Sequence, residues 1–327
     1  MVVIALIILL VLALIFMGNF IMDLIRRKKS NEKKYRKREV ILAMVLMIPA
    51  VVLAFFFVLL PIFFSLGFAF TDFVILEPDK INFVGFDQFK RLFDEFTTNK
   101  DIFYAFRNTA IFVVFVVPLQ ITLALLLALF CNNKRRGTTI FKVCFFAPVA
   151  ISLTITCYLW SIILSPNPQG IMNSFLKIFG MSEQDFLGNK NTVLFWMVII
   201  SAWQGCGYQM LIFLSALGNI RKDLYEAASI DGANVFRRFF TVTLPGLKPT
   251  FLYILITVFV GACRVLIQPM LLTGYNTNSL TLSYFMVQKG NATDGGIGYS
   301  CAVALMLTIF IGTITLVQRK LLGEKKR

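Results

Sequence analysis

Seven long apolar runs dominate this sequence and limit what it can fold into. They cover about residues 2–24, 41–70, 108–131, 141–164, 193–217, 250–272 and 298–318. Each run is long enough to cross the ~30 Å hydrocarbon core of a bilayer as a helix. Hydrophobic residues make up 58% of the chain and charged residues only 15%, which is more apolar surface than a water-soluble core of this size could bury. The sequence therefore predicts an all-α polytopic membrane protein.

The basic residues are divided unevenly between the two sides of the predicted membrane. The connections at 26–38, 134–142 and 221–248 and the tail from residue 319 hold 23 Lys and Arg residues, whereas the alternate connections hold eight. Because Lys and Arg mark the cytoplasmic side, we expect the N-terminus outside and the C-terminus in the cytoplasm. The net charge of +15 is then a topology signal, and no nucleic-acid partner is expected.

Several kinds of chemistry are excluded by residues that the sequence lacks. It contains no histidine, which removes Ser-His-Asp and Cys-His catalysis and histidine metal sites. Its six cysteines lie in or beside apolar runs without a CxxC pair, so they are interpreted as small core residues. No GxxxxGK[ST] phosphate loop is present, so the chain cannot cradle ATP phosphates itself. We expect neither a catalytic centre nor a bound metal or cofactor in this chain.

The charged segment at residues 25–40 divides the predicted spans into one and six. Residues 1–40 are interpreted as a retained N-terminal anchor with a basic cytoplasmic linker, and residues 41–327 as a six-helix core. In the outside connection at 71–107, Phe86, Phe89, Phe93 and Phe96 follow a helical spacing. This spacing predicts an interfacial helix, with a docking surface for an outside partner as the alternative.

The cytoplasmic connection at 218–249 carries the clearest local signals. Helix formers occupy 222–230, and Asp231-Gly232 is a turn signal because glycine readily adopts positive φ. A second short helix is predicted at 233–240 and ended by Leu244-Pro245. The hairpin either packs on the protein's own helices or forms a knob for a cytoplasmic partner.

This hairpin resembles a known motif. The sequence EAASIDGA at 226–233, followed by Leu244-Pro245, resembles the EAA motif of ABC importer permeases. Residues 200–225 are similar to the preceding span in the carbohydrate branch of that family, and the similarity extends over about 80–318. The resemblance implies a type I ABC importer transmembrane domain, similar to maltose-type and glycerol-3-phosphate-type sugar permeases, with one extra N-terminal helix.

The resemblance also implies a function and a set of partners. Such a subunit moves a sugar or oligosaccharide, including an anionic glycoside, across the cytoplasmic membrane. It pairs with a second homologous permease subunit within membrane lipid and sits on two ATPase subunits, which bind ATP and magnesium. An extracytoplasmic solute-binding protein delivers the solute. The motif implies that the ATPase-coupling residues are Glu226, Ala227, Ala228, Asp231, Gly232, Ala233, Leu244 and Pro245, with Glu226 facing the ATPase and Gly232 making the turn.

Polar residues within the fifth and sixth spans are candidates for the translocation pathway, because polar groups in a membrane are costly and usually face a cavity or another helix. By resemblance, Trp203, Gly205 and Tyr208 fall where a maltose-type permease contacts its sugar. Aromatic faces stack on sugar rings, and amides such as those of Gln204 and Gln209 bond hydroxyls. The alternative is that Trp203 and Tyr208 only pack between helices.

The sixth span offers Thr257, Cys263, Arg264 and Gln268, of which we select Thr257 and Arg264 as solute contacts. Arg264 is expected inside the span, and no acidic residue in spans two to seven could pair with it. Its guanidinium would bond the solute, water or amides, or alternatively a neighbouring helix.

Two other functions fit seven predicted helices. A seven-helix receptor would match the orientation but leaves the EAA-like hairpin unexplained. A membrane enzyme such as a glycosyltransferase would need carboxylates, and spans two to seven contain none. The importer permease is therefore the favoured interpretation.

Overall fold

The computed structural model describes residues 37–75, 81–98, 100–132, 137–274, 276–291 and 296–322. These residues form helices and one isolated antiparallel bridge between Thr71 and Phe83, which confirms the all-α prediction. The predicted first span at 2–24 lies outside the described residues. The chain divides into two compact units, Met1–Gly67 and Phe68–Arg327, and each is described by itself.

The first unit contains one long apolar helix. Helix α2 (Lys37–Ala54) continues through the π-helical turn η1 (Phe55–Leu59) into α3 (Leu60–Phe68). The segment Val45–Phe68 is long and apolar enough to cross a membrane, and only 6% of its most apolar window is buried. Pro61 lies just after η1 and crowds the carbonyl four residues before it, so the wider π turn accommodates the ring.

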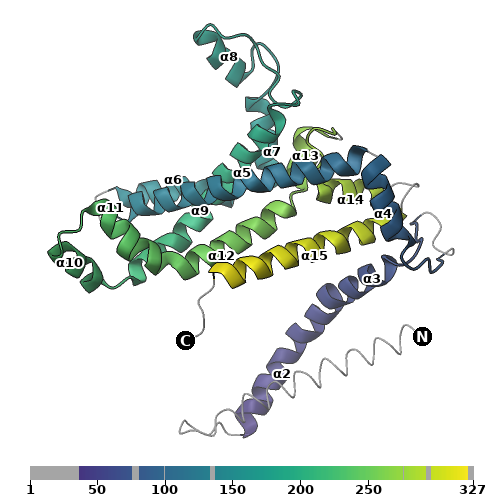
Figure 1. Ribbon diagram of the computed structural model, residues 1–327, viewed down its shortest axis with the longest axis horizontal. Coiled ribbons are helices and arrows are strands. Elements are labelled where there is room, and N and C mark those ends of the chain that lie inside the picture. Colours follow the sequence, from purple (N-terminus) through teal and green to yellow (C-terminus); the bar gives the residue numbers. More distant parts are fainter. Residues whose placement is uncertain are drawn as a thin grey trace. The chain divides into compact units, whose positions relative to one another are not determined.

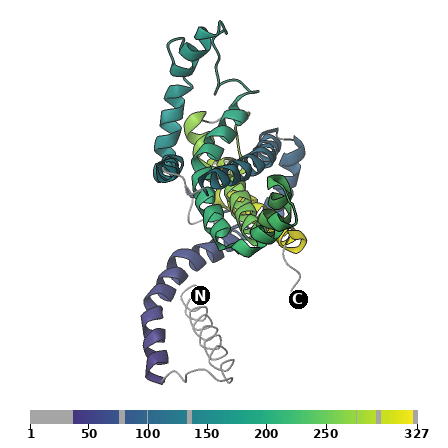
Figure 2. The same ribbon diagram turned by 90° about the vertical axis from the view of Figure 1, so that its left-hand side faces the viewer.

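The second unit holds the remaining helices. Their bounds are α4 (Asp87–Thr98), α5 (Lys100–Cys131), α6 (Thr138–Ala150), α7 (Leu153–Ile163), α8 (Ile171–Ile178), α9 (Val193–Asn219), α10 (Lys222–Ile230), α11 (Val235–Arg238), η2 (Phe239–Thr243), α12 (Leu244–Cys263), α13 (Ile267–Leu272), α14 (Leu282–Asn291) and α15 (Gly296–Leu322). Figure 1 shows α10 and α11 at one end of the long helices and α4, α13 and α14 at the other. Helices α7 and α8 form an arm that extends from the long helices in both Figure 1 and Figure 2.

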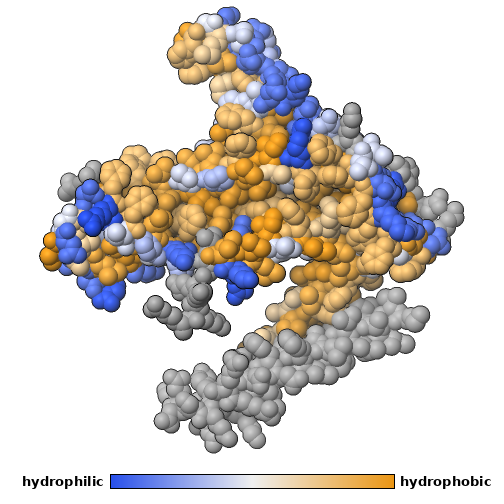
Figure 3. All heavy atoms as spheres, viewed as in Figure 1, coloured by the Kyte–Doolittle hydropathy of each residue, from blue (hydrophilic) through white to orange (hydrophobic). Residues whose placement is uncertain are grey.

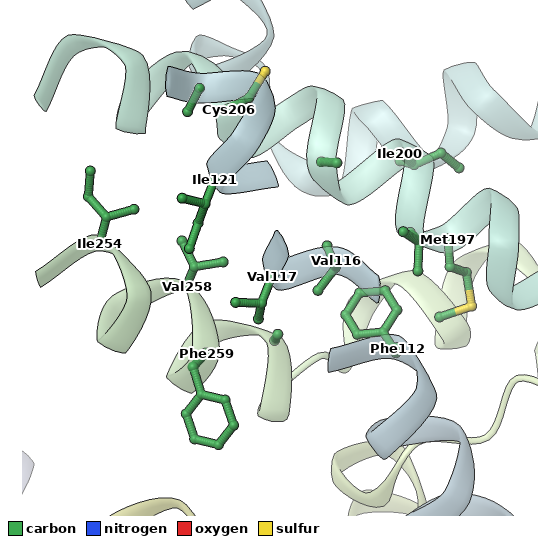
Figure 4. Packing of buried hydrophobic residues seen from close by; sticks show 14 of the residues in the cluster. Phe112, Val116, Val117, Ile121, Met197, Ile200, Cys206, Ile254, Val258 and Phe259 are labelled. Atoms are coloured by element: carbon green, nitrogen blue, oxygen red, sulfur yellow. The ribbon is translucent and has the colours of Figure 1, made fainter. Parts of the chain in front are cut away.

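Helices α5, α9 and α12 pack together around the main apolar core. Figure 4 shows side chains from all three helices meeting there, and the labelled ones are Phe112, Val116, Val117, Ile121, Met197, Ile200, Cys206, Ile254, Val258 and Phe259. Lipid tails are as apolar as these side chains, so close packing rather than exclusion from water holds such helices together. The core therefore depends on how closely the backbones approach.

A glycine on α9 sets one of these close approaches. A Cβ atom added at Gly207 would lie 2.3 Å from the backbone oxygen of Phe145 on α6. Real atoms do not come this close, so α6 can rest on α9 only because residue 207 has no side chain.

The apolar surface of the second unit matches a membrane environment. Figure 3 shows hydrophobic residues along the long helices, with hydrophilic residues gathered near α10, near α4 and on the α7–α8 arm. By length and composition, the described chain has five helices that could cross a membrane, or up to six if α6 and α7 count as one broken span. The predicted spans at 41–70, 108–131, 193–217 and 298–318 each correspond to one of these helices.

The predicted single span at 141–164 is wrong in one respect, because the chain bends by 99° between α6 and α7. Ile151 is extended (φ −84°, ψ 134°), three residues after Pro148 in the last turn of α6. The Ser152 side chain then accepts a hydrogen bond from the Ile155 amide at 3.3 Å and caps α7. A proline in the last turn and a serine cap thus end one helix and start another within the apolar run.

The sixth predicted span, 250–272, is displaced. The helix that could cross the membrane runs from Val235 to Cys263, and α13 is a separate short helix. Leu244-Pro245 does not end the preceding helix as predicted, because the chain continues through η2 into α12. As at Pro61, the π turn lies just before the proline and removes its clash with the carbonyl of Thr241.

The connection at 71–107 contains the predicted helix as α4. Before it, Asp72 accepts hydrogen bonds from the backbone amide (2.7 Å) and the side-chain amide (3.0 Å) of Asn82. These bonds, the one from the side-chain amide above all, stabilise the charged carboxylate and lower the pKa of Asp72. The ionised carboxylate therefore ties Asp72 to Asn82 across this connection.

The α6–α9 contact gives a stability prediction. We expect Gly207→Ala to lower the free energy of unfolding of the purified chain by about 1–3 kcal/mol, and its melting temperature with it, because the new methyl would push two backbones apart. Gly218→Ala is the matched control, because Gly218 is also on α9 but has open space where its Cβ would be. Thermal unfolding in detergent is the measurement, and equal melting temperatures for the two variants would contradict the close contact.

Candidate functional site

A cavity of about 690 Å³, with a mostly apolar lining that includes several polar side chains, lies among α5, α9, α12 and the start of α13. Its lining residues are Phe112, Val116, Gln120, Val149, Leu153, Ser201, Gln204, Gly205, Tyr208, Gln209, Thr257, Val258, Gly261, Ala262, Arg264, Val265, Leu266, Ile267 and Gln268. Four of the five predicted solute contacts are among them, namely Gly205, Tyr208, Thr257 and Arg264. We call this space the central cavity.

Four glutamines from three helices face the central cavity. Gln268 on α13 accepts a hydrogen bond from the Ser201 hydroxyl at 2.7 Å, and the Gln204 side chain donates to the Ile151 carbonyl at 3.1 Å. Gln209 is only 8% exposed, and its side-chain oxygen has no hydrogen-bond partner among the described residues. Leaving a buried acceptor unpaired costs about 1–3 kcal/mol, and this oxygen is enclosed by the surrounding side chains.

The fourth amide, Gln120 on α5, occupies the place of the side chain that Gly205 lacks. A Cβ atom added at Gly205 would lie 2.1 Å from the Gln120 side-chain nitrogen. Gly205 therefore makes room for the amide as well as lining the cavity. Gln120 and Ser201 were not predicted from the sequence, although a glutamine within the apolar run at 108–131 is the same signal that indicated Gln204 and Gln209.

Arg264 is placed by a break in the helix rather than inside a span, which corrects the sequence prediction. It is the C-cap residue of α12 (φ −103°, ψ 17°), and its amide bonds the Gly261 carbonyl at 3.2 Å. Its side chain is exposed in the central cavity and makes no hydrogen bond or ion pair within the described residues. The cavity lining contains no acidic residue, so Arg264 gives it a positive charge.

Side chains from neighbouring segments hold this break open. The Thr281 hydroxyl donates to the Val265 carbonyl at 2.7 Å, and the Ser283 hydroxyl to the Cys263 carbonyl at 3.4 Å. Buried Asn108 on α5 donates to the carbonyls of Thr277 (2.8 Å) and Leu280 (3.0 Å). Backbone groups freed by the break thus find partners inside the protein, as a membrane requires.

The two aromatic candidates have different surroundings. Tyr208 is 50% exposed and lines both the central cavity and a second hollow of about 550 Å³ that reaches Asn219 and Gly246. Trp203 does not line the central cavity; it packs edge-on against Trp160 of α7, with ring centroids 5.8 Å apart. Thr257 lines the cavity, but its hydroxyl already bonds the carbonyls of Tyr253 and Ile254, both at 3.0 Å.

The helical hairpin predicted at 222–240 is present as α10 and α11, and we call residues 222–238 the coupling hairpin. Helix α10 ends in a Schellman motif, in which the Ala233 amide bonds the Ala228 carbonyl (2.9 Å) and the Gly232 amide bonds the Ser229 carbonyl (3.1 Å). Gly232 has the positive φ (73°) that this motif needs. Asn234 then caps α11 by accepting from the Arg237 amide at 2.8 Å. The spacing of the EAA-like residues thus follows from the end of one helix and the start of the next.

The surface of the coupling hairpin is unusually apolar for an exposed turn. Ile230, Val235 and Phe236 are exposed, and Phe236 keeps 78% of its surface accessible. Glu226 is also exposed, on α10. These side chains form a mixed apolar and acidic surface that nothing in the described chain covers.

The contact between Gly205 and Gln120 predicts a selective effect on the cavity. We expect Gly205→Ala to displace the Gln120 amide and weaken solute binding about tenfold, as for one lost hydrogen bond at a buried site. Gly261→Ala, also in the cavity lining but with open space at its Cβ, is the control and should bind normally. Solute-dependent protection of the purified complex against thermal unfolding is the measurement. Equal protection of the two variants would contradict the packing described here.

Comparisons with known proteins agree with this architecture. A family model described as binding-protein-dependent transport system inner membrane component matches residues 99–325. The chain is 33% identical over 253 residues to the arabinooligosaccharides transport system permease protein AraP of Bacillus subtilis, covering 76% of this chain and 79% of that protein. It is 30% identical over 293 residues to the diacetylchitobiose uptake system permease protein NgcF of Streptomyces coelicolor, covering 83% and 81% of the two chains.

The fold is also similar to a solved structure. A chain in the crystal structure of a bacterial ABC transporter involved in the import of the acidic polysaccharide alginate matches with a TM-score of 0.76 and 22% identity, covering 89% of this chain and 98% of that one. At this identity the likeness concerns the fold. Together with the family match over residues 99–325, it shows that this multi-pass membrane protein belongs to the inner membrane components of binding-protein-dependent transport systems and has the transmembrane fold of type I ABC importers.

Proposed function

We propose that this chain is a permease subunit that moves a sugar or oligosaccharide across the cytoplasmic membrane, driven by ATP hydrolysis on partner subunits. The observation that carries this proposal is the central cavity, which is lined by four glutamines, a tyrosine and an arginine within a family of import permeases. Relatives named for arabino-oligosaccharide and diacetylchitobiose transport support a carbohydrate as the solute.

The cavity chemistry suits a hydroxyl-rich solute. Amide side chains both donate and accept hydrogen bonds, and hydroxyl groups of a sugar do the same. The exposed guanidinium of Arg264 would donate to a pair of vicinal oxygens on the solute, and the Gln209 side chain would turn its enclosed, unpaired oxygen toward a solute hydroxyl. We propose Gly205, Tyr208, Thr257 and Arg264 as solute contacts and add Gln120 and Gln209, while the solute contact of Trp203 stays a prediction.

The coupling hairpin is proposed as the contact with the ATPase subunits. Its exposed apolar residues and Glu226 form a surface suited to a cleft in a protein partner. The chain has no phosphate-binding loop of its own, so ATP and magnesium would be bound by those partners. Glu226, Ala227, Ala228, Asp231, Gly232, Ala233, Leu244 and Pro245 would serve this contact or hold its shape.

The other partners follow from the family and the charge distribution. A second permease subunit would complete the pathway, and an extracytoplasmic binding protein would deliver the solute; the family's description as binding-protein-dependent supports the latter. The basic connections favour a cytoplasmic coupling hairpin and an α7–α8 arm outside, with the N-terminus outside and the C-terminus inside. Residues 1–40 would act as an anchor and linker outside the transport core.

The coupling role makes a prediction for the hairpin. We expect Gly232→Val to abolish transport, because a β-branched residue at φ 73° would distort the Schellman turn. Gly180→Val is the control, since Gly180 also has a positive φ (70°) and open space but lies in the connection after α8. Likewise, Glu226→Lys should abolish transport and Glu183→Lys should not. Uptake into cells and co-purification with the ATPase are measured, and normal values for both hairpin variants would rule the role out.

Arg264 gives a second test, on the solute side. We expect Arg264→Gln to leave assembly and ATPase association intact and to reduce uptake about tenfold or more, since it removes the charge and the planar set of donors. Lys177→Gln, on the exposed surface of α8, serves as the control. Unchanged uptake kinetics, or a defect confined to folding, would remove Arg264 from the pathway.

A further inference from the structure

The coupling hairpin is joined to the cavity by one long helix. The helical stretch from Val235 to Cys263 contains 29 residues, so it spans about 43 Å at 1.5 Å per residue. It begins in the hairpin, carries Thr257 and Gly261 along the central cavity and ends directly before Arg264. A movement of the coupling hairpin would therefore shift the cavity end of this helix, provided that α10 is firmly attached to the helix.

Helix α10 is attached to this long helix by few side chains. Within α10 only Tyr225 and Ala228 are not exposed. The Tyr225 hydroxyl lies 3.0 Å from the hydroxyl of Thr243, which is buried (5% exposed) and is the last residue of η2. A second link lies nearer the surface, where the exposed Ser229 hydroxyl accepts a hydrogen bond from the half-buried Arg238 side chain at 3.0 Å.

The place of this bond on the long helix is distinctive. The π turn η2 ends at Thr243, and Leu244-Pro245 follows at once. A π turn and a proline both weaken the regular hydrogen-bond ladder of a helix, and π turns occur frequently at functional sites. The helix could bend or rewind at this point and absorb a movement of the hairpin. The hydroxyl bond joins α10 to Thr243, which is both the last residue of η2 and the N-cap residue of α12.

We propose that the hydrogen bond between Tyr225 and Thr243 is a strut that passes the movement of α10 across η2 into α12. Tyr225 and Thr243 are thus positioning residues, which touch neither the solute nor ATP. This inference rests on the proposed coupling function of the hairpin. Without the strut, α10 would move with the ATPase while η2 yields, and ATP hydrolysis would continue without a matching change in the central cavity.

The cavity end of α12 offers a reporter for this movement. Gly261 lines the central cavity and has open space where its Cβ would be, so Gly261→Cys introduces a thiol without a clash. The exposed Cys144 and half-buried Cys301 are replaced by serine in the parent protein. The chain is assembled with its partner permease and ATPase subunits in lipid nanodiscs. The rate of labelling by a charged methanethiosulfonate reagent is compared without nucleotide and after trapping with magnesium, ATP and vanadate.

The matched variants separate the strut from its surroundings. Tyr225→Phe and Thr243→Val each remove one hydroxyl, while Thr243→Ser keeps it. Tyr253→Phe and Thr241→Val are the controls, because they remove hydroxyls from the same helix at exposed positions, and the Thr241 hydroxyl bonds only within its own helix. Hydrogen exchange of the backbone amides of α10 is measured in parallel.

We expect nucleotide trapping to change the labelling rate in the parent protein, in Thr243→Ser and in both controls. In Tyr225→Phe and Thr243→Val the ratio of the two rates should fall toward one, while ATP hydrolysis and subunit assembly persist. The double variant should lower the ratio of the two labelling rates no further than either single variant does. Exchange of α10 amides should become about two- to tenfold faster, as for the loss of one hydrogen bond.

Two results would overturn the proposal. One is that Tyr225→Phe keeps the parental ratio of labelling rates. The other is that it loses that ratio only together with assembly and ATP hydrolysis, which is the result of a purely structural bond. A failure of the coupling function itself is distinguishable, because Glu226→Lys and Gly232→Val would then also leave the parental ratio unchanged.

Discussion

A backbone group inside a membrane must find its hydrogen-bond partner within the protein, and the working parts of this structure depend on that requirement. The chain leaves the helix at Cys263, in the apolar zone, and frees carbonyl groups there. Thr281 and Ser283 supply hydroxyls to those carbonyls, and Asn108 fixes the segment that carries them. Because of this break, Arg264 lies at a helix end and its charged side chain is exposed in the central cavity.

Glycines make the second contribution to the packing of the helices around the central cavity. Gly207 lets α6 rest on α9, and Gly205 gives Gln120 its place in the cavity wall. Both glycines lie on the same helix, two residues apart, and so face neighbouring helices in different directions. The shape of the cavity thus depends on the absence of side chains at these glycines as well as on its polar groups. A sequence scan for polar residues does not detect the contribution of the glycines.

The sequence predicted the helical class, the positions of most spans and the coupling hairpin, because long apolar runs and an Asp-Gly turn have few other solutions. It misplaced the ends of two spans. The bend at Ile151 depends on a proline and a serine cap inside a run of uniform hydropathy, and the break at Arg264 depends on partners from residues 281–283. Gln120 carried a usable polar signal, but its place beside Gly205 appears only when α5 lies against α9. Contacts between distant segments thus decided the break at Arg264 and the role of Gln120, whereas the bend at Ile151 depends on local residues that hydropathy does not register.

The two π turns share a sequence setting, since η1 and η2 are each followed directly by Leu-Pro. A π turn accommodates one residue more than a regular turn, and one residue corresponds to about 100° of rotation about the helix axis. The side chains after η2 are therefore turned by that angle relative to an uninterrupted helix. Which side chains of α12 line the central cavity thus depends on the number of residues in η2 rather than on the composition of the helix. Permeases that differ by one residue there would present a different set of side chains to their solutes, even with every pore residue retained.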